Sequence, residues 1–288
     1  MPHPRFVRVG LGFSSPEFSL LFAGPLWVRV CYNRPVFHLT KPKLPVTEEQ
    51  QRWTDAGFLR LAKLLGRRRL FESTVVTPTP QHFPDRYDRS EAALQLMFNR
   101  VAAYMQVGPS EAQLTLFAEG HDLTRDLVPF HEGQTSGAGG LYYHDDDGRT
   151  HISVNENQLK DPMALVATLA HELGHIILLR PGLVDRDAPD MEPLNDLLTV
   201  FLGFGIFTAN SAFRFEQHQD GRSQGWSVQR AGYLSEELFG YALARFAFER
   251  GEPKPRWASH LSSNIARHFK RSADWLIRQK ASQLFRRT

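Results

Sequence analysis

The segment His171-Glu172-Leu173-Gly174-His175 brings together three side chains that can do chemistry. Two histidines four residues apart on a helix leave the same face about one turn from each other, so both imidazoles can meet one metal ion. A carboxylate beside them can take a proton from water and return it to a leaving group. Because independent placement would produce this spacing in roughly 3% of such chains, chance explains it poorly. The spacing predicts a zinc centre suited to hydrolysis.

A hydrolytic zinc site takes a third protein ligand and leaves its fourth place to water. We expect this ligand to be Glu192, because it lies in the first turn of the next predicted helix. Asp196 shares the helical face of Glu192 and can accept the free ring proton of a ligand histidine. The ordinary interpretation of Glu192 is an acid favoured by the helix N-terminus. The competing ligands are Asp185, Asp187 and Asp190.

The helix that carries the two histidines is predicted to begin after Asp161, with Pro162 in its first turn, and to end near Arg180. Its other residues are nearly all apolar, so it must be largely buried. Polar residues on an ordinary surface helix are the alternative interpretation, but buried polar groups need partners. One metal ion would satisfy both imidazoles together.

The surrounding sequence predicts an α+β fold. Helices are expected from Thr47, Ser90, Asp190 and Ser235, each of which is a capping residue or follows one. Strands are expected at 75–76, 114–117, 141–143 and 151–154, the last two forming a hairpin across 145–148. A long loop with short strands is expected over 211–234. The expected organisation is an irregular extension over 1–46, a catalytic domain over 47–252 and a basic helix over 253–288.

The chain resembles the zincin metallopeptidases, specifically the gluzincin branch, in which His-Glu-x-x-His is followed on a later helix by Glu-x-x-x-Asp. The matching positions lie within residues 141–200 and are His171, Glu172, His175, Glu192 and Asp196. The stretches 152–155 and 170–179 also resemble small bacterial zincins related to antitoxin-associated and stress-response proteases. The resemblance implies a short mixed sheet over the active-site helix, a mainly helical C-terminal part, and a peptide or protein substrate.

The resemblance also implies two further parts of a catalytic site. An edge strand, either 141–143 or 152–154, would align an extended peptide by backbone pairing. A donor from beyond the third ligand would stabilise the oxyanion. Tyr233 is preferred for this role over His218 and Arg230. Packing at a helix entrance is the alternative role of Tyr233.

Composition bounds the class of protein. With 42% hydrophobic and 23% charged residues among 288, the chain is typical of a folded protein. Its single cysteine, Cys31, excludes an intramolecular disulfide and a cysteine-based zinc cluster, and favours a reducing compartment. The apolar stretch 18–31 contains Pro25 and Arg29 and is too short to span a bilayer. Without a clean signal cleavage site, we expect a cytoplasmic protein with no membrane span.

Residues 253–288 contain nine Lys or Arg against one acid, Asp274. Such a tail could contact nucleic acid or an anionic membrane surface. Apolar residues at helical spacing favour instead a docked helix with a solvated basic face; they are Ile265, Phe269, Ala273 and Leu276.

Three functions follow from these features. The first is a zinc peptidase with Glu172 as general base, and the second is a catalytically silent zinc-binding regulatory or binding protein of the same fold. The third is a nucleic-acid-associated protein guided by the basic tail. Glu172 favours the first, because a purely structural zinc needs no general base.

Overall fold

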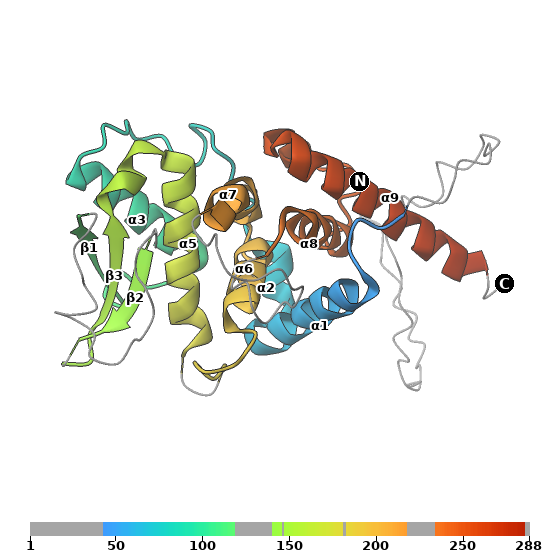
Figure 1. Cartoon of the computed structure of the whole chain (residues 1–288), viewed down its shortest axis with the longest axis horizontal. Helices are drawn as coiled ribbons and strands as arrows, with labels where there is room; N and C mark the ends of the chain where they lie inside the picture. Colours follow the sequence, from blue (N-terminus) through green and yellow to red (C-terminus); the bar gives the residue numbers. More distant parts are fainter. Residues whose placement is uncertain (1–42, 119–139, 146, 181–182, 218–233, 286–288) are drawn as a thin grey trace, which may run out of the picture. The chain divides into compact units, whose positions relative to one another are not determined.

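The structure is a computed structural model that describes residues 43–118, 140–145, 147–180, 183–217 and 234–285. These residues belong to one compact unit that runs from Leu39 to Thr288. Helices and one three-stranded mixed sheet make up the described part, which confirms the expected α+β class (Figure 1). Most of the expected extension over 1–46 lies outside the described residues, as does Cys31.

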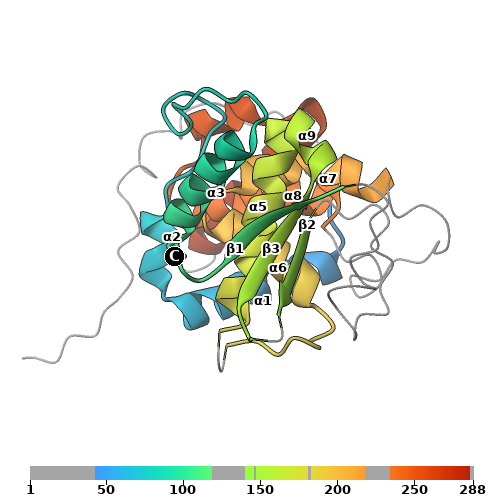
Figure 2. The same ribbon diagram turned by 90° about the vertical axis from the view of Figure 1, so that its left-hand side faces the viewer.

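The sheet consists of β1 (Gln113–Phe117), β2 (Gly140–His144) and β3 (Thr150–Asn155) in the order β1-β3-β2. The predicted hairpin is confirmed, because β2 and β3 pair antiparallel, whereas β1 and β3 pair parallel. Since β3 has partners on both sides, the expectation that 152–154 forms an edge strand is wrong. Among the described strands, β1 and β2 form the edges. Figure 2 shows the sheet lying across α5 (Pro162–Leu178).

The N-terminal helices begin where their capping residues predict. Thr47 and Gln50 form a reciprocal capping box at the start of α1 (Glu48–Leu65), and the Ser90 side chain caps α3 (Glu91–Met105). The short helix α2 (Arg67–Glu72) lies between them.

The expected strand at 75–76 is absent from this described part of the chain. The Val76 N–H donates to the Gly203 carbonyl at 3.0 Å, and Val76 is fully buried. A close approach of Gly203 to Thr74 and a φ of +90° explain why glycine stands there. The burial of Val76 therefore comes from a loop packed on another loop, without a strand ladder.

The central helix is α5, which contacts the sheet strands β2 and β3 as well as α3, α6 and α7. The Asp161 side chain caps it by accepting from the N–H groups of Met163 and Ala164. A short 3-10 helix, η2 (Glu156–Lys160), leads into it. Every residue from Ala164 to Leu178 is buried, including the polar residues of the histidine motif. Figure 1 shows α5 standing beside the sheet, with α6 and α7 on its other side.

The second half of the described chain is helical. Its elements are α6 (Met191–Phe201), α7 (Gly205–Gln217), α8 (Glu236–Glu249), the 3-10 helix η3 (Arg256–His260) and α9 (Ser263–Phe285). The Ser235 side chain caps α8 as expected. The expectation of a loop over 211–217 is wrong, because these residues continue α7. Contacts of α7 with α5, α6 and α8 explain a helix where the local sequence favours none.

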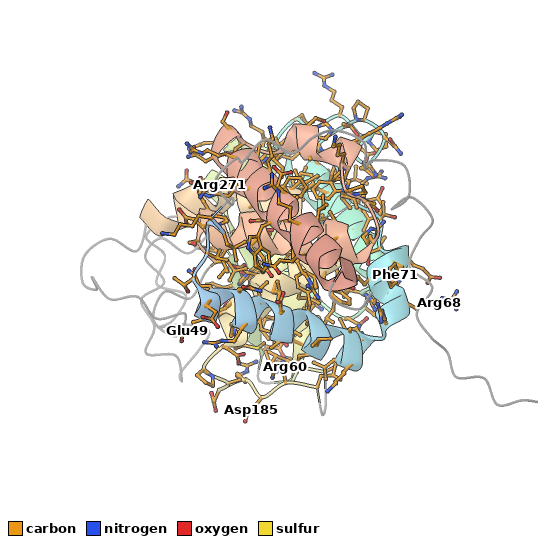
Figure 3. All side chains as sticks on the ribbon, turned by 90° about the vertical axis from the view of Figure 1, so that its right-hand side faces the viewer. Glu49, Arg60, Arg68, Phe71, Asp185 and Arg271 are labelled. Atoms are coloured by element: carbon orange, nitrogen blue, oxygen red, sulfur yellow. The ribbon has the colours of Figure 1, made fainter. Side chains whose placement is uncertain are left out.

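The basic segment forms the expected docked helix. Within α9, Ile265, Phe269 and Leu276 are buried, whereas Arg267, Lys270 and Arg278 are exposed. The helix packs on α8, and Figure 3 shows another basic residue, Arg271, at the surface. In the described segments, no helix combines the length and the apolar character that crossing a bilayer requires.

Candidate metal centre

Three potential ligand atoms converge where α5 meets the first turn of α6. His171 and His175 lie one turn apart on α5, with ring centres 5.0 Å apart, and both are buried. Glu192 reaches them from α6, and its Oε2 lies 3.0 Å from His171 Nε2 and 3.5 Å from His175 Nε2. The structure therefore brings the expected third ligand to the two histidines.

The donor set and its spacing could hold a metal ion. The three ligand atoms lie within 4.8 Å of one another, and within the described residues no other group of three or more His, Cys, Asp or Glu does so. Ligand atoms about 2.0–2.1 Å from a tetrahedral zinc are about 3.3 Å apart, which falls between the two measured distances. Two imidazole nitrogens and one carboxylate oxygen are also a known ligand set of hydrolytic zinc.

Asp196 orients the first histidine from behind. Its Oδ1 lies 3.0 Å from His171 Nδ1, and its Oδ2 accepts the Leu234 N–H at 3.0 Å. A proton on Nδ1 would leave the lone pair of His171 Nε2 available to a metal ion, which is the tautomer that a metal ligand needs. The same carboxylate therefore links the residue before the Ser235 cap to His171.

Asn195 joins α5 to α6 between the two acids. Its amide donates to the His171 carbonyl at 2.8 Å, and its Oδ1 is buried without a hydrogen-bond partner in the described structure. A Cβ added to Gly174 would overlap Asn195 Oδ1, well inside 3.0 Å. The glycine within the histidine motif is therefore required by the close approach of α6.

The Glu172 side chain lies against the start of β2, near both motif histidines. Its carboxylate is buried, and no described residue forms a hydrogen bond with it. A Cβ on Gly140 would lie 2.9 Å from Glu172 Oε1, so the start of β2 passes directly over this side chain. Burial raises the pKa of Glu172, and the nearby His171 and His175 oppose that shift.

Glu192 has the opposite electrostatic environment. Burial alone would raise its pKa, but hydrogen bonds and charge interactions with His171 and His175 outweigh this effect. They hold the pKa of Glu192 well below its usual range, although 43% of its side chain is exposed. The carboxylate is therefore ionised, as a metal ligand must be.

The competing ligands lie outside the group. Asp190 pairs with Arg60 at 3.3 Å, whereas Asp185 and Asp187 are exposed. Figure 3 shows Asp185 at the edge of the molecule, pointing outward.

The expected oxyanion donors all precede Leu234 in the chain. Tyr233, His218 and Arg230 lie outside the described residues. Leu234, which follows Tyr233 in the chain, is described and is bound to Asp196.

Three side chains near the centre were not expected from the sequence. Tyr142 stacks on His175, with ring centres 5.6 Å apart and an angle of 29° between the planes. His144 Nε2 lies 3.1 Å from the Tyr142 hydroxyl, and the Arg186 guanidinium lies 5.6 Å from the Tyr142 ring centre. Strand alternation places Gly140, Tyr142 and His144 on one face of β2, and this signal could have identified two of them.

Comparisons with protein-family models, with curated proteins and with solved structures give no match for this chain.

Proposed function

We propose that the chain is a zinc-dependent hydrolase of the zincin type, and most specifically a metallopeptidase. His171, His175 and Glu192 are the proposed zinc ligands, and Glu172 is the proposed general base. One observation carries the proposal: a carboxylate from a separate helix reaches both motif histidines within 3.5 Å, while Asp196 holds the outer nitrogen of the first. A chance His-Glu-x-x-His sequence would require neither contact.

The proposed chemistry divides between the ion and one carboxylate. When bound, zinc lowers the pKa of a water ligand toward neutrality and polarises the carbonyl that is attacked. Glu172 takes the proton of the attacking water on its carboxylate and then delivers it to the leaving amine. Its position in a buried site keeps competing water away from this proton.

The sheet supports a peptide as the substrate. Among the described strands, β2 has a partner on one side only, so its other edge offers backbone N–H and C=O groups to an extended chain. Gly140 lies on this strand directly against Glu172, because a Cβ added to it would lie 2.9 Å from Glu172 Oε1. A peptide paired with β2 would thus run past the proposed catalytic carboxylate.

Glu172→Gln separates a peptidase from a catalytically silent zinc protein of the same fold. This variant should keep its zinc, because Glu172 is not a ligand, and should lose cleavage by about 10²- to 10⁴-fold. Glu49→Gln is a matched control, since Glu49 is an exposed carboxylate on α1. The measurements are zinc content and cleavage of a broad peptide library. Cleavage by Glu172→Gln at the wild-type rate, or none by the zinc-loaded wild type, would contradict the proposal.

A further inference from the structure

A cation lies beside the proposed metal centre but belongs to no part of it. Arg186 is in the segment between α5 and α6, and its guanidinium carbon lies 5.6 Å from the centre of the Tyr142 ring. The same ring stacks on the His175 imidazole at 5.6 Å between centres. Because each of these two distances is 5.6 Å, the Arg186 guanidinium lies at most twice 5.6 Å from the centre of the His175 ring.

Arg186 has no carboxylate partner in the described part of the chain. The Asp185 side chain bonds to the backbone of its own turn, where its Oδ1 accepts a hydrogen bond from the Asp187 N–H at 3.1 Å. Two other acids near this surface also have partners. Asp145 pairs with His151 at 2.8 Å, and Glu192 binds the two motif histidines.

The side chains around Arg186 favour an anion. Tyr142 and His144, which lie next to it, carry no negative charge at neutral pH. An exposed guanidinium over an aromatic ring keeps a planar set of donors that matches a carboxylate. By contrast, Arg180 on the other side of this segment is paired with Glu111 at 3.0 Å.

We infer that Arg186 forms a substrate subsite for a carboxylate, which binds there while a peptide bond lies beside Glu172 and the zinc ligands. This inference rests on the proposed peptidase function and names its substrate class: peptides that carry a carboxylate near the cleaved bond. Tyr142 contacts both the cation and His175, so it sets the distance from the subsite to the metal centre.

The geometry limits where the carboxylate can stand in the peptide. An extended chain advances about 3.3 Å per residue, so twice the 5.6 Å distance corresponds to about three residues. A peptide offers a carboxylate from two sources, its C-terminus and the side chain of an Asp or Glu. Both have the same charge and shape, and the subsite takes either one within about three residues of the cleaved bond.

Binding measurements on the full-length, zinc-loaded Glu172→Gln protein test this subsite without turnover. The probes are the tetrapeptide acetyl-Ala-Ala-Phe-Ala with a free C-terminus, its C-terminal amide, and amides with one Asp at each position in turn. Affinities are measured by calorimetry with Arg186 intact, with Arg186→Gln and with Arg186→Lys. Arg278→Gln, which removes an exposed cation on α9, is the matched control. Zinc content is measured for every variant.

With Arg186 intact, we expect the free acid or one Asp amide to bind about 5- to 20-fold more tightly than the neutral amide. Arg186→Gln removes this preference and leaves the zinc content and the neutral-amide affinity unchanged, and Arg186→Lys restores part of it. The probe that gains affinity shows whether the subsite binds a C-terminal or a side-chain carboxylate. Equal affinities for all probes, an equal loss with Arg278→Gln, or zinc loss in Arg186→Gln overturns the inference. Cleavage by the wild type is measured separately, so a failed peptidase proposal is recognised by itself.

Discussion

α5 and α6 are joined by hydrogen bonds of buried polar side chains, whereas α8 and α9 pack mainly through apolar ones. The first pair buries His171, His175, Asn195 and Asp196. The second pair buries Ile265, Phe269 and Leu276 and leaves Arg267, Lys270 and Arg278 exposed. Burying polar groups costs free energy unless each finds a partner, so a cluster of them inside a core indicates a function. The exposed basic residues of α9 need no such explanation.

Removing a histidine from each helix pair should give the largest contrast. His171→Ala should lose nearly all of about one zinc per chain, because two remaining ligands bind the ion weakly. His268→Ala, which changes a histidine on α9 that lies 3.8 Å from Glu237, should keep its zinc. Metal analysis of the purified proteins measures both. Undiminished zinc in His171→Ala would overturn the assignment.

Of the two acids of α6, Glu192 should contribute more to zinc binding than Asp196. Glu192→Ala should lose most of the zinc, and Asp196→Ala should weaken zinc affinity by roughly 10- to 100-fold. Asp196→Ala also leaves the Leu234 N–H unpaired, which should lower the free energy of unfolding by about 1–3 kcal/mol. Zinc titration and denaturant unfolding measure the two effects. Negligible effects of both changes would return the ligand role to Asp185, Asp187 or Asp190.

A glycine in each helix pair separates zinc binding from stability. Gly174→Ala pushes on Asn195, between the two acids, so it should lower both the stability and the zinc affinity. Gly240→Ala in α8 pushes on the backbone of α9 near His268, so it should lower stability alone. Each change should cost about 1–3 kcal/mol of unfolding free energy. Equal zinc affinities in the two variants would show that the contact with Asn195 does not position the ligands.

The exposed charges of α9 should have the smallest effect. Replacing Arg267, Lys270 and Arg278 together by Gln should change the unfolding free energy by about 0.5 kcal/mol or less, with zinc content and peptide cleavage unchanged. Tight, salt-sensitive binding of DNA or RNA by the wild type that disappears in this variant would instead support the nucleic-acid role of the tail.

Local signals identified the elements that carry the proposed metal ligands. The caps at Asp161 and Ser235 were predicted correctly, because a capping side chain acts on backbone two or three residues away. Glu192 and Asp196 were identified because residues four apart share one helical face. Their approach to the histidines depends on the packing of α6, which the sequence did not specify.

Non-local contacts explain what the sequence could not predict. Arg186 and Tyr142 are 44 positions apart, and only the fold brings the guanidinium over the ring. Residues 211–217 continue α7, a helix that packs against three other helices, although their local pattern favours a loop. Val76 is buried without strand pairing, and its apolar character alone cannot distinguish a buried loop from a strand.

Crystallography at the zinc absorption edge tests the central claim most directly. An anomalous difference map of the zinc-loaded wild type should contain one peak, about 2.0–2.1 Å from His171 Nε2, from His175 Nε2 and from a Glu192 carboxylate oxygen. The peak should be lost in crystals of Glu192→Ala and retained in Glu172→Gln. A peak at Asp185, Asp187 or Asp190, or no peak between α5 and α6 at full zinc loading, would contradict the assignment.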